Sequence, residues 1–207
     1  MKRLALLGAS GHGKVVADTA LCSGWDSVCF FDAAWPRLER NGPWQVQGDE
    51  RALLASLDHY DGVLVSIGNC GTRWNLQQKM QQIGAPLVTL IHPSAVVSRY
   101  ATLGLGTVVM AGAVINAGAV VGPGCIVNTG ATVDHDCVLA EAVHVCPGAH
   151  LSGDVRVGQG SWIGVGASVK HGIVIGESVT VGAGAAVVTS VADRLTVVGV
   201  PATSRLD

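Results

Sequence analysis

The stretch ATVDHDCVLAEAVHVCPG, residues 131–148, contains the pattern that decides the fold of most of the chain. Val133, Leu139 and Val145 stand six residues apart within it. A spacing of six fits neither the helical period of about 3.6 residues nor the alternation of a strand. It is typical of a triangular coil that carries one short strand on each of its three faces, so that one turn takes three hexads.

The hexad pattern continues in both directions without a change of register. Every sixth residue from Val97 to Val187 is Val, Leu or Ile, which gives sixteen consecutive matches. The residue four places later is usually small, as at Ala131 and Cys137. We therefore predict a parallel β-helix of about five turns over residues 91–207, with turns stacked about 4.8 Å apart.

Residues 1–90 follow a different pattern, in which short apolar runs alternate with helical stretches. This alternation predicts a small Rossmann-like parallel sheet built from βαβ units. Residues 33–50 are rich in Gly and Pro and are predicted to be an irregular connection. The predicted strands cover residues 3–8, 27–32, 62–69 and 86–91, and the predicted helices cover residues 15–24 and 72–84.

Composition argues against several classes of protein. The net charge of −2 provides no electrostatic footprint for nucleic acid or for an anionic membrane. No apolar run reaches the length of a transmembrane helix. The six cysteines show no CxxC pair and are predicted to be reduced and mostly buried, so we expect a cytoplasmic protein.

Several motifs together resemble a known family. They are the opening GASGHGKVVAD (8–18), the hexads with DHDC (134–137) and VHVCPGA (143–149), and the tail VVGVPA (197–202). The combination resembles the sialic acid O-acetyltransferase/sugar O-acyltransferase family of hexapeptide-repeat transferases. Within that family it resembles the bacterial UDP-4-amino-sugar N-acetyltransferases of bacillosamine-type pathways. The resemblance implies a left-handed β-helix, acetyl-CoA as cosubstrate without a permanently bound cofactor, and a homotrimer with active sites between subunits.

The glycine-rich segment Gly8–Gly13 lies between a predicted strand and a predicted helix. Glycines let the backbone approach a phosphate, and a helix N-terminus offers N–H groups to it. The spacing G-x-x-G-x-G departs from the dinucleotide fingerprint, so NAD binding is not expected, and a tight turn without a ligand is the alternative. Lys14 and Arg73 could contact phosphate or be surface charges. The resemblance implies that the UDP-sugar is held by Ser10, Gly11, His12, Asp32, Ala33, Ile67, Gly68 and Asn69; Ala33 stands where the family often has a second acid.

His135 lies between Asp134 and Asp136, outside the inward-facing set. A carboxylate beside a histidine orients the ring and raises its basicity, which suits a general base near neutral pH. The alternative is a solvated edge with three polar residues. The resemblance implies that His135 is the base and that Asp136 raises its basicity, although the residues alone leave Asp134 open as the partner. Adjacent strand side chains point to opposite faces, so His135 and Asp136 can meet only near a corner or through backbone distortion.

His144 follows His135 by nine residues, half of the predicted turn, which places it on the opposite side of the coil. If both serve one site, two subunits must contribute. The resemblance assigns His144, Val165, Gly182 and Ala183 to acetyl-CoA binding; a structural hydrogen bond is the alternative for His144. His171 follows His135 by two turns, about 10 Å along the same edge, and its role is left open.

These features predict an acetyl-CoA-dependent N-acetyltransferase acting on the amine of a nucleotide-linked, most simply UDP-linked, 4-amino-4,6-dideoxy sugar. In this prediction the amine attacks the thioester directly, with His135 as general base. One alternative is an O-acetyltransferase acting on sialic acid or another sugar hydroxyl. Another is a β-helix zinc carbonic anhydrase using His135, His144 and His150, and a third is a non-catalytic nucleotide-sugar binder. The acceptor sugar and the choice between UDP and dTDP are left open.

Overall fold

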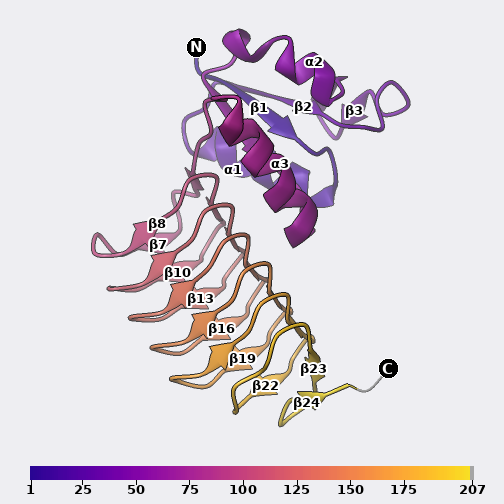
Figure 1. Ribbon diagram of the computed structural model, residues 1–207. Helices are drawn as coiled ribbons and strands as arrows, with labels where there is room; N and C mark the ends of the chain where they lie inside the picture. The colour runs from indigo at the N-terminus through magenta and orange to yellow at the C-terminus, as the bar shows by residue number, and fades with distance from the viewer. Residues whose placement is uncertain (206–207) are drawn as a thin grey trace. The chain divides into compact units, whose positions relative to one another are not determined.

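The computed structural model describes residues 1–205, and the chain divides into two compact units, Met1–Pro93 and Ser94–Asp207 (Figure 1). The division lies between residues 93 and 94, whereas the sequence pattern predicts a boundary between residues 90 and 91. Among the helices of residues 1–205, none combines the length and the apolar character needed to cross a membrane.

The first unit is built on a five-stranded sheet with the strand order β3-β4-β2-β1-β5. Strands β4, β2, β1 and β5 are parallel, and only the short edge strand β3 is antiparallel. This arrangement confirms the predicted Rossmann-like parallel sheet. The strands are β1 (Arg3–Leu7), β2 (Ser27–Phe31), β3 (Arg40–Asn41), β4 (Trp44–Gly48) and β5 (Gly62–Val65).

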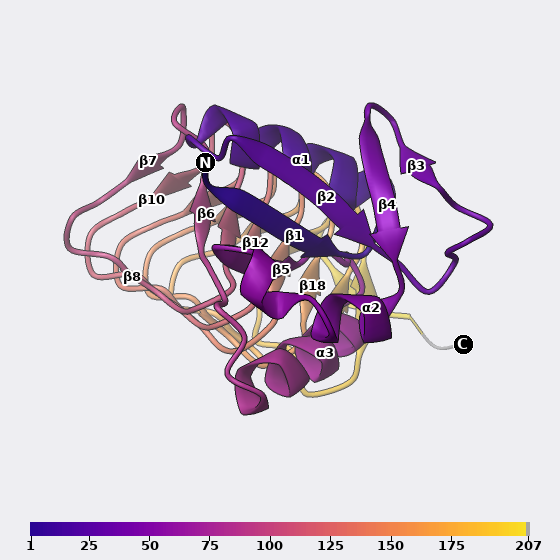
Figure 2. The same ribbon diagram turned by 90° about the horizontal axis from the view of Figure 1, so that it is seen from above.

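Helices cover both faces of this sheet. Helix α1 (Gly11–Cys22) lies on one face, while α2 (Glu50–Leu54) and α3 (Cys70–Gln82) lie on the other (Figure 2). Leu53 of α2 and Met80 of α3 pack in one buried cluster with strand residues such as Leu7, Phe31 and Val65. Because α1 follows β1 and α3 follows β5, both helices begin at the carboxyl edge of adjacent parallel strands.

The prediction of an irregular connection over residues 33–50 is confirmed for residues 33–39, which form turns, and is wrong from residue 40 onward. Residues 40–50 contain β3, β4 and the start of α2, and β4 extends the parallel sheet through the pairing of Val46 with Phe30. Gly42 and Pro43 form the tight turn of the β3–β4 hairpin, so these turn residues hid two short strands. The predicted strand at residues 86–91 shrinks to a bridge at Leu87 and the two-residue strand β6 (Leu90–Ile91).

The second unit is a left-handed parallel β-helix with three faces, which confirms the predicted fold class. The first face comprises β7 (Val96–Val97), β10 (Val114–Ile115), β13 (Thr132–Val133), β16 (His150–Leu151), β19 (Ser168–Val169) and β22 (Ala186–Val187). The second face comprises β8 (Thr102–Leu103), β11 (Val120–Val121), β14 (Val138–Leu139), β17 (Arg156–Val157) and β20 (Val174–Ile175). The third face includes β9 (Val108–Val109), β12 (Ile126–Val127), β15 (His144–Val145), β18 (Trp162–Ile163), β21 (Thr180–Val181), β23 (Thr196–Val198) and β24 (Thr203–Ser204).

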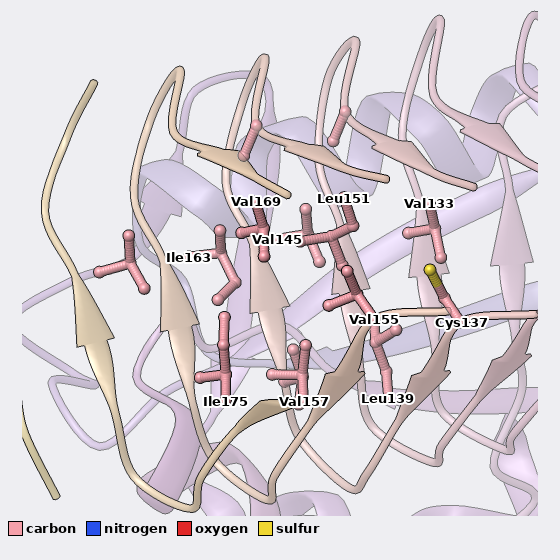
Figure 3. Packing of buried hydrophobic residues seen from close by; sticks show 14 of the residues in the cluster. Val133, Cys137, Leu139, Val145, Leu151, Val155, Val157, Ile163, Val169 and Ile175 are labelled. Atoms are coloured by element: carbon pink, nitrogen blue, oxygen red, sulfur yellow. The ribbon is translucent and has the colours of Figure 1, made fainter. Parts of the chain in front are cut away.

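The hexad aliphatic side chains form the core of the β-helix. The paired strands from β7 to β22 are offset by one coil of 18 residues, as in the pairing of Val114 with Thr132, and β23 pairs with β21 at an offset of 16 residues. From Val109 to Val187, each sixth residue is at most 2% exposed, and Figure 3 shows such side chains meeting inside the coils. Burying each of these side chains stabilises the fold by about 1.5–3 kcal/mol. Five of the six cysteines are buried and all six are free thiols, as predicted.

Candidate active site

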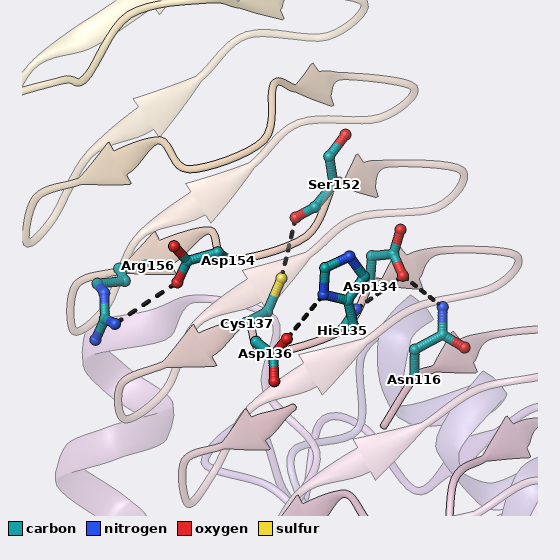
Figure 4. A network of polar contacts seen from close by, with 8 residues as sticks. All are labelled: Asn116, Asp134, His135, Asp136, Cys137, Ser152, Asp154 and Arg156. Atoms are coloured by element: carbon teal, nitrogen blue, oxygen red, sulfur yellow. Dashed lines mark hydrogen bonds and ion pairs between the residues drawn. The ribbon is translucent and has the colours of Figure 1, made fainter. Parts of the chain in front are cut away.

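The segment Asp134–Asp136 forms a corner of the β-helix between β13 and β14 (Figure 4). Asp136 has a φ of 60°, in the left-handed region that many other corners fill with glycine. Aspartate is among the few residues with a side chain that adopt this conformation readily. The turn at this corner brings two neighbouring side chains to the same side of the backbone, which a regular strand does not allow.

The imidazole of His135 and the carboxylate of Asp136 form a hydrogen bond. Nδ1 of His135 lies 2.8 Å from Oδ2 of Asp136. This bond, aided by the negative charges of Asp134, Asp136 and Asp154, raises the pKa of His135. Because the carboxylate accepts a hydrogen bond from the N–H at Nδ1, Nε2 of the neutral ring carries the lone pair that can take up a proton.

Asp134 accepts hydrogen bonds from a backbone N–H and from a side-chain amide rather than from the imidazole. Its Oδ1 accepts hydrogen bonds from the backbone N–H of His135, at 2.8 Å, and from the side-chain amide of Asn116, at 2.7 Å. These two bonds lower the pKa of the Asp134 carboxyl. Asp134 therefore fixes the backbone of the corner, and Asp136 is the partner of the imidazole.

Cys137 follows this corner but faces the interior. The Cys137 side chain is fully buried, and Sγ donates a hydrogen bond to the carbonyl of Ser152 at 3.1 Å. Burial raises the pKa of the thiol, which keeps it protonated and weakly nucleophilic. The arrangement therefore favours a base at this corner over a covalent nucleophile.

His144 lies in β15 on the third face, across the coil from the corner of His135. It is 4% exposed, the side-chain amide of Asn128 lies 3.0 Å from its Nε2, and its ring contacts Trp162 edge to face. The structure therefore gives His144 the structural hydrogen bond that was the alternative interpretation. Its assignment to acetyl-CoA stays a prediction.

Two further histidines are His150, which lies in β16 on the first face, and His171, which lies at the corner between β19 and β20. Nδ1 of His150 lies 2.9 Å from the hydroxyl of Thr132, and the ring centroid of His171 lies 6.1 Å from that of His135. The carbonic anhydrase alternative would use His135, His144 and His150 as zinc ligands. In the structure, these three side chains have three different hydrogen-bond partners. Within residues 1–205, no three His, Cys, Asp or Glu side chains are arranged to hold a metal ion.

The remaining predicted acetyl-CoA contacts lie at another corner of the β-helix. Val165 follows β18 and is 54% exposed, and Gly182 and Ala183 follow β21 one coil later. The two coils are joined there by a hydrogen bond from the N–H of Gly184 to the carbonyl of Val165, at 2.8 Å. This corner connects the third face to the first, whereas His135 lies where the first face meets the second.

The first unit contains a pocket of about 390 Å³ at the carboxyl edge of its sheet. It includes Asp32, Ala33 and Ile67, three of the residues predicted to hold the nucleotide sugar. The lining residues from α2 and α3 were not predicted as part of a binding site, and Glu50 lies in a segment that was predicted to be irregular. The lining consists of Leu7, Gly8, Asp32, Ala33, Glu50, Ile67, Thr72 and Leu76.

Asp32 joins the glycine-rich segment to the turn after β2. Its two carboxylate oxygens accept the backbone N–H groups of Ala9, at 2.7 Å, and Ala34, at 2.8 Å. Gly8 has a φ of 116°, and a Cβ there would overlap the side chain of Ile67. Contacts with Asp32 and with Ile67 therefore constrain the conformation of the glycine-rich segment before any ligand binds.

The other predicted nucleotide-binding residues lie at two helix N-termini rather than in the pocket lining. Ser10 is the N-cap of α1, and Gly11 and His12 form its first turn. Gly68 precedes Asn69, the N-cap of α3, whose side chain accepts the N–H of Thr72 at 2.9 Å. Two helix starts at one sheet edge are a suitable environment for a negatively charged group.

Arg73 is a buried structural residue rather than a surface charge. It is 1% exposed and donates to the carbonyls of Ile67, at 2.9 Å, and Gly68, at 2.7 Å. Burial, aided by the charge of Arg73, lowers the pKa of His12 to about 4. His12 is therefore neutral near pH 7 and can offer a hydrogen bond but no charge, whereas Lys14 is exposed.

Comparisons with known proteins agree with this architecture. Residues 3–80 match the PglD N-terminal domain. The UDP-N-acetylbacillosamine N-acetyltransferase of Bacillus subtilis (strain 168) is 40% identical over 118 residues. That match covers 54% of this chain and only about half, 52%, of the relative.

Two solved structures match over nearly their whole length. The acetyltransferase domain of PglB from Neisseria gonorrhoeae FA1090, in complex with acetyl coenzyme A, is 43% identical with a TM-score of 0.94, and 99% of each chain is covered. A histidine-to-asparagine variant of perosamine N-acetyltransferase from Caulobacter crescentus, in complex with CoA and GDP-perosamine, is 39% identical with a TM-score of 0.95. That match covers 100% of this chain and 98% of the other. The chain therefore belongs to the sialic acid O-acetyltransferase/sugar O-acyltransferase family of hexapeptide-repeat transferases, in the branch that carries a PglD-type N-terminal domain.

Proposed function

We propose that this protein transfers the acetyl group of acetyl-CoA to the amine of a nucleotide-linked amino sugar, most simply a 4-amino-4,6-dideoxy sugar. The hydrogen-bonded pair of His135 and Asp136 at an exposed corner is the observation that carries the proposal. Similarity supports it, because structures of relatives about 40% identical contain acetyl coenzyme A in one case and CoA with GDP-perosamine in another.

In the proposed reaction, the neutral amine attacks the carbonyl carbon of the thioester, and Nε2 of His135 takes the proton that the nitrogen loses. The C–S bond then breaks as the C–N bond is completed. The proton passes from His135 to the leaving thiolate, which gives an N-acetylated sugar and free CoA. Asp136 keeps Nδ1 protonated and stabilises the imidazolium, while a backbone N–H would stabilise the oxyanion.

The first unit is proposed to hold the nucleotide part of the acceptor. Its pocket has apolar walls from Leu7, Ile67 and Leu76, which suit a nucleobase, and polar groups from Asp32 and Thr72, which suit hydroxyls. The nearby N-termini of α1 and α3, with Ser10, Gly11, His12, Gly68 and Asn69, would receive the diphosphate through backbone N–H groups.

A second copy of the chain is proposed to complete the site. Val165, Gly182 and Ala183, the proposed acetyl-CoA contacts, lie at a different corner from His135 in the same chain, and His144 lies on the third face. Acetyl-CoA bound along that corner of one β-helix can serve the base of a neighbouring one. A closed trimer satisfies this requirement at all three sites at once.

The proposal is tested by following CoA release with a thiol reagent across UDP-, dTDP- and GDP-linked 4-amino sugars. Both UDP and GDP belong in the panel because the relatives are named for sugars carried by different nucleotides. We expect release with at least one of these acceptors and an N-acetylated product by mass spectrometry. Release with hydroxyl acceptors only would replace the proposal with O-acetylation, and no release with any acceptor would overturn it.

A further inference from the structure

The corner that carries His135 recurs in every coil. The type of residue at the position equivalent to His135 differs from coil to coil. Successive coils place different residues at this position, 18 residues apart. They are Arg99, Ala117, His135, Gly153, His171 and Thr189. Five of the six carry side chains, so the β-helix itself does not require glycine there. The backbone of Gly153 also lies outside the left-handed region, so its conformation does not require glycine either.

The reason for a glycine at 153 lies in the ring of His135. A Cβ built on Gly153 would lie 2.5 Å from Cε1 and 3.0 Å from Cδ2 of His135, and closer still to Nε2. Real Cβ atoms essentially never approach other atoms so closely, so a side chain at position 153 would displace the imidazole, which is the half-exposed end of the His135 side chain. The imidazole therefore lies directly over Gly153, which is buried, whereas Ala117 one coil before His135 is exposed.

The position of His171 supports the same description. Its coil lies two strand spacings beyond that of His135, about 10 Å along the stack. The two ring centroids are nevertheless only 6.1 Å apart, with an interplanar angle of 42°. The rings approach each other because no side chain projects between them from the intervening coil.

The carboxylate of Asp136 likewise lies over a glycine, Gly118, which belongs to the preceding coil. A Cβ on Gly118 would overlap Oδ1 of Asp136. Gly118 has a φ of 75°, so its backbone also favours glycine, and only Gly153 isolates the effect of the missing side chain.

We propose that Gly153 is a positioning residue for the base: the space left by its absent side chain holds the imidazole of His135 with Nδ1 on Asp136 and leaves no side chain at position 153 to cover Nε2. This inference rests on the proposed function for its catalytic consequence. The placement of the ring is a property of the resting protein.

The decisive variant is Gly153→Ala, with Ala117→Ser as the matched control that adds one atom at the same corner position of a neighbouring coil. We expect kcat of the Gly153 variant to fall about 100-fold, the loss typical of a misplaced catalytic group. The KM values for both substrates should stay within about twofold, and the acid limb of the pH–rate profile should move to lower pH as the bond to Asp136 weakens. The control should keep its kcat.

A second measurement does not depend on activity. If the added methyl group collides with the ring, Gly153→Ala should lower the denaturation midpoint in the wild-type background but not in a His135→Ala background. Nitrogen NMR of the ring should also show loss of the Nδ1–H tautomer in the single variant. Equal destabilisation in both backgrounds, or a Gly153 variant with wild-type kcat and an unchanged His135 spectrum, would overturn the inference. A wild-type protein without transferase activity would instead refute the proposed function. The denaturation midpoints in the two backgrounds and the His135 spectrum would still test the position of the ring.

Discussion

Asp136→Asn is the sharpest perturbation of the proposed base. Asparagine has nearly the same shape as aspartate and is equally tolerant of the left-handed φ of 60° at this corner. The substitution therefore preserves the turn and changes only the charge and the hydrogen-bonding character of the group 2.8 Å from Nδ1 of His135. An amide that donates to Nδ1 would also force the proton onto Nε2, the atom that must accept it.

The exposure of the pair limits the expected magnitude. The side chains of His135 and Asp136 are 54% and 68% exposed, so water screens their interaction. A general base contributes about 10²–10⁴-fold to a rate, and a screened partner that only assists the base accounts for a fraction of that contribution. We expect kcat to fall about 10–100-fold with little change in KM. Because the hydrogen bond raises the pKa of His135, its loss lowers that pKa, and the acid limb moves to lower pH.

The assay is initial-rate CoA release over a pH series, with Asp154→Asn as the control. Asp154 occupies the same corner position one coil later, with a φ of 54°, and its carboxylate pairs with Arg156 at 3.6 Å. The control removes the same charge from the same backbone conformation and should keep most of its activity. Equal losses in the two variants would show that a general negative field, rather than the bond to Nδ1, supports the rate. An Asp136 variant with wild-type kcat and pH profile would refute the reasoning altogether.

Three further predictions concern stability and ligand affinity. The unfolding free energy should decrease as the pH falls from about 6.5 toward 4, by on the order of 3 kcal/mol, because the unfolded chain binds a proton on His12 that the folded chain does not. Denaturant titrations over this range should show a smaller decrease in His12→Asn. Arg73→Lys should lose carbonyl bonds that hold Ile67 and Gly68, which costs about 1–3 kcal/mol by thermal unfolding and raises KM for the nucleotide sugar more than it changes kcat. Val133→Ala should cost about 2 kcal/mol in a denaturant titration because Val133 is fully buried in the β-helix.

The β-helix was predictable because one physical rule repeats along it. Each hexad must place an aliphatic residue such as Val133 or Leu139 inside, and sixteen repetitions leave little room for another interpretation. The β3–β4 hairpin was not predictable in the same way. Strands of two and five residues offer little periodicity, and turn residues between them dominate the local signal.

The candidate site shows the same difference between repeating and single features. The sequence required a corner or a distortion for His135 to meet Asp136, but only the structure shows a left-handed Asp136 at that corner. It could not assign Gly153, because the residue lies 18 positions away and its meaning depends on where a ring points. The sequence left open whether Arg73 contacts phosphate or is a surface charge. In the structure Arg73 is buried and donates hydrogen bonds to two backbone carbonyls, and no local sequence pattern reveals these contacts.

The most direct test of the account compares wild-type protein with His135→Ala under single-turnover conditions, with acetyl-CoA and the best nucleotide amino sugar both bound. The side chain of His135 is proposed to act on the proton and not to hold either substrate. The account therefore predicts that the variant binds both substrates with affinities within about threefold of wild type but transfers acetyl about 10²–10⁴-fold more slowly. Transfer at the wild-type rate with both substrates bound would contradict the central claim.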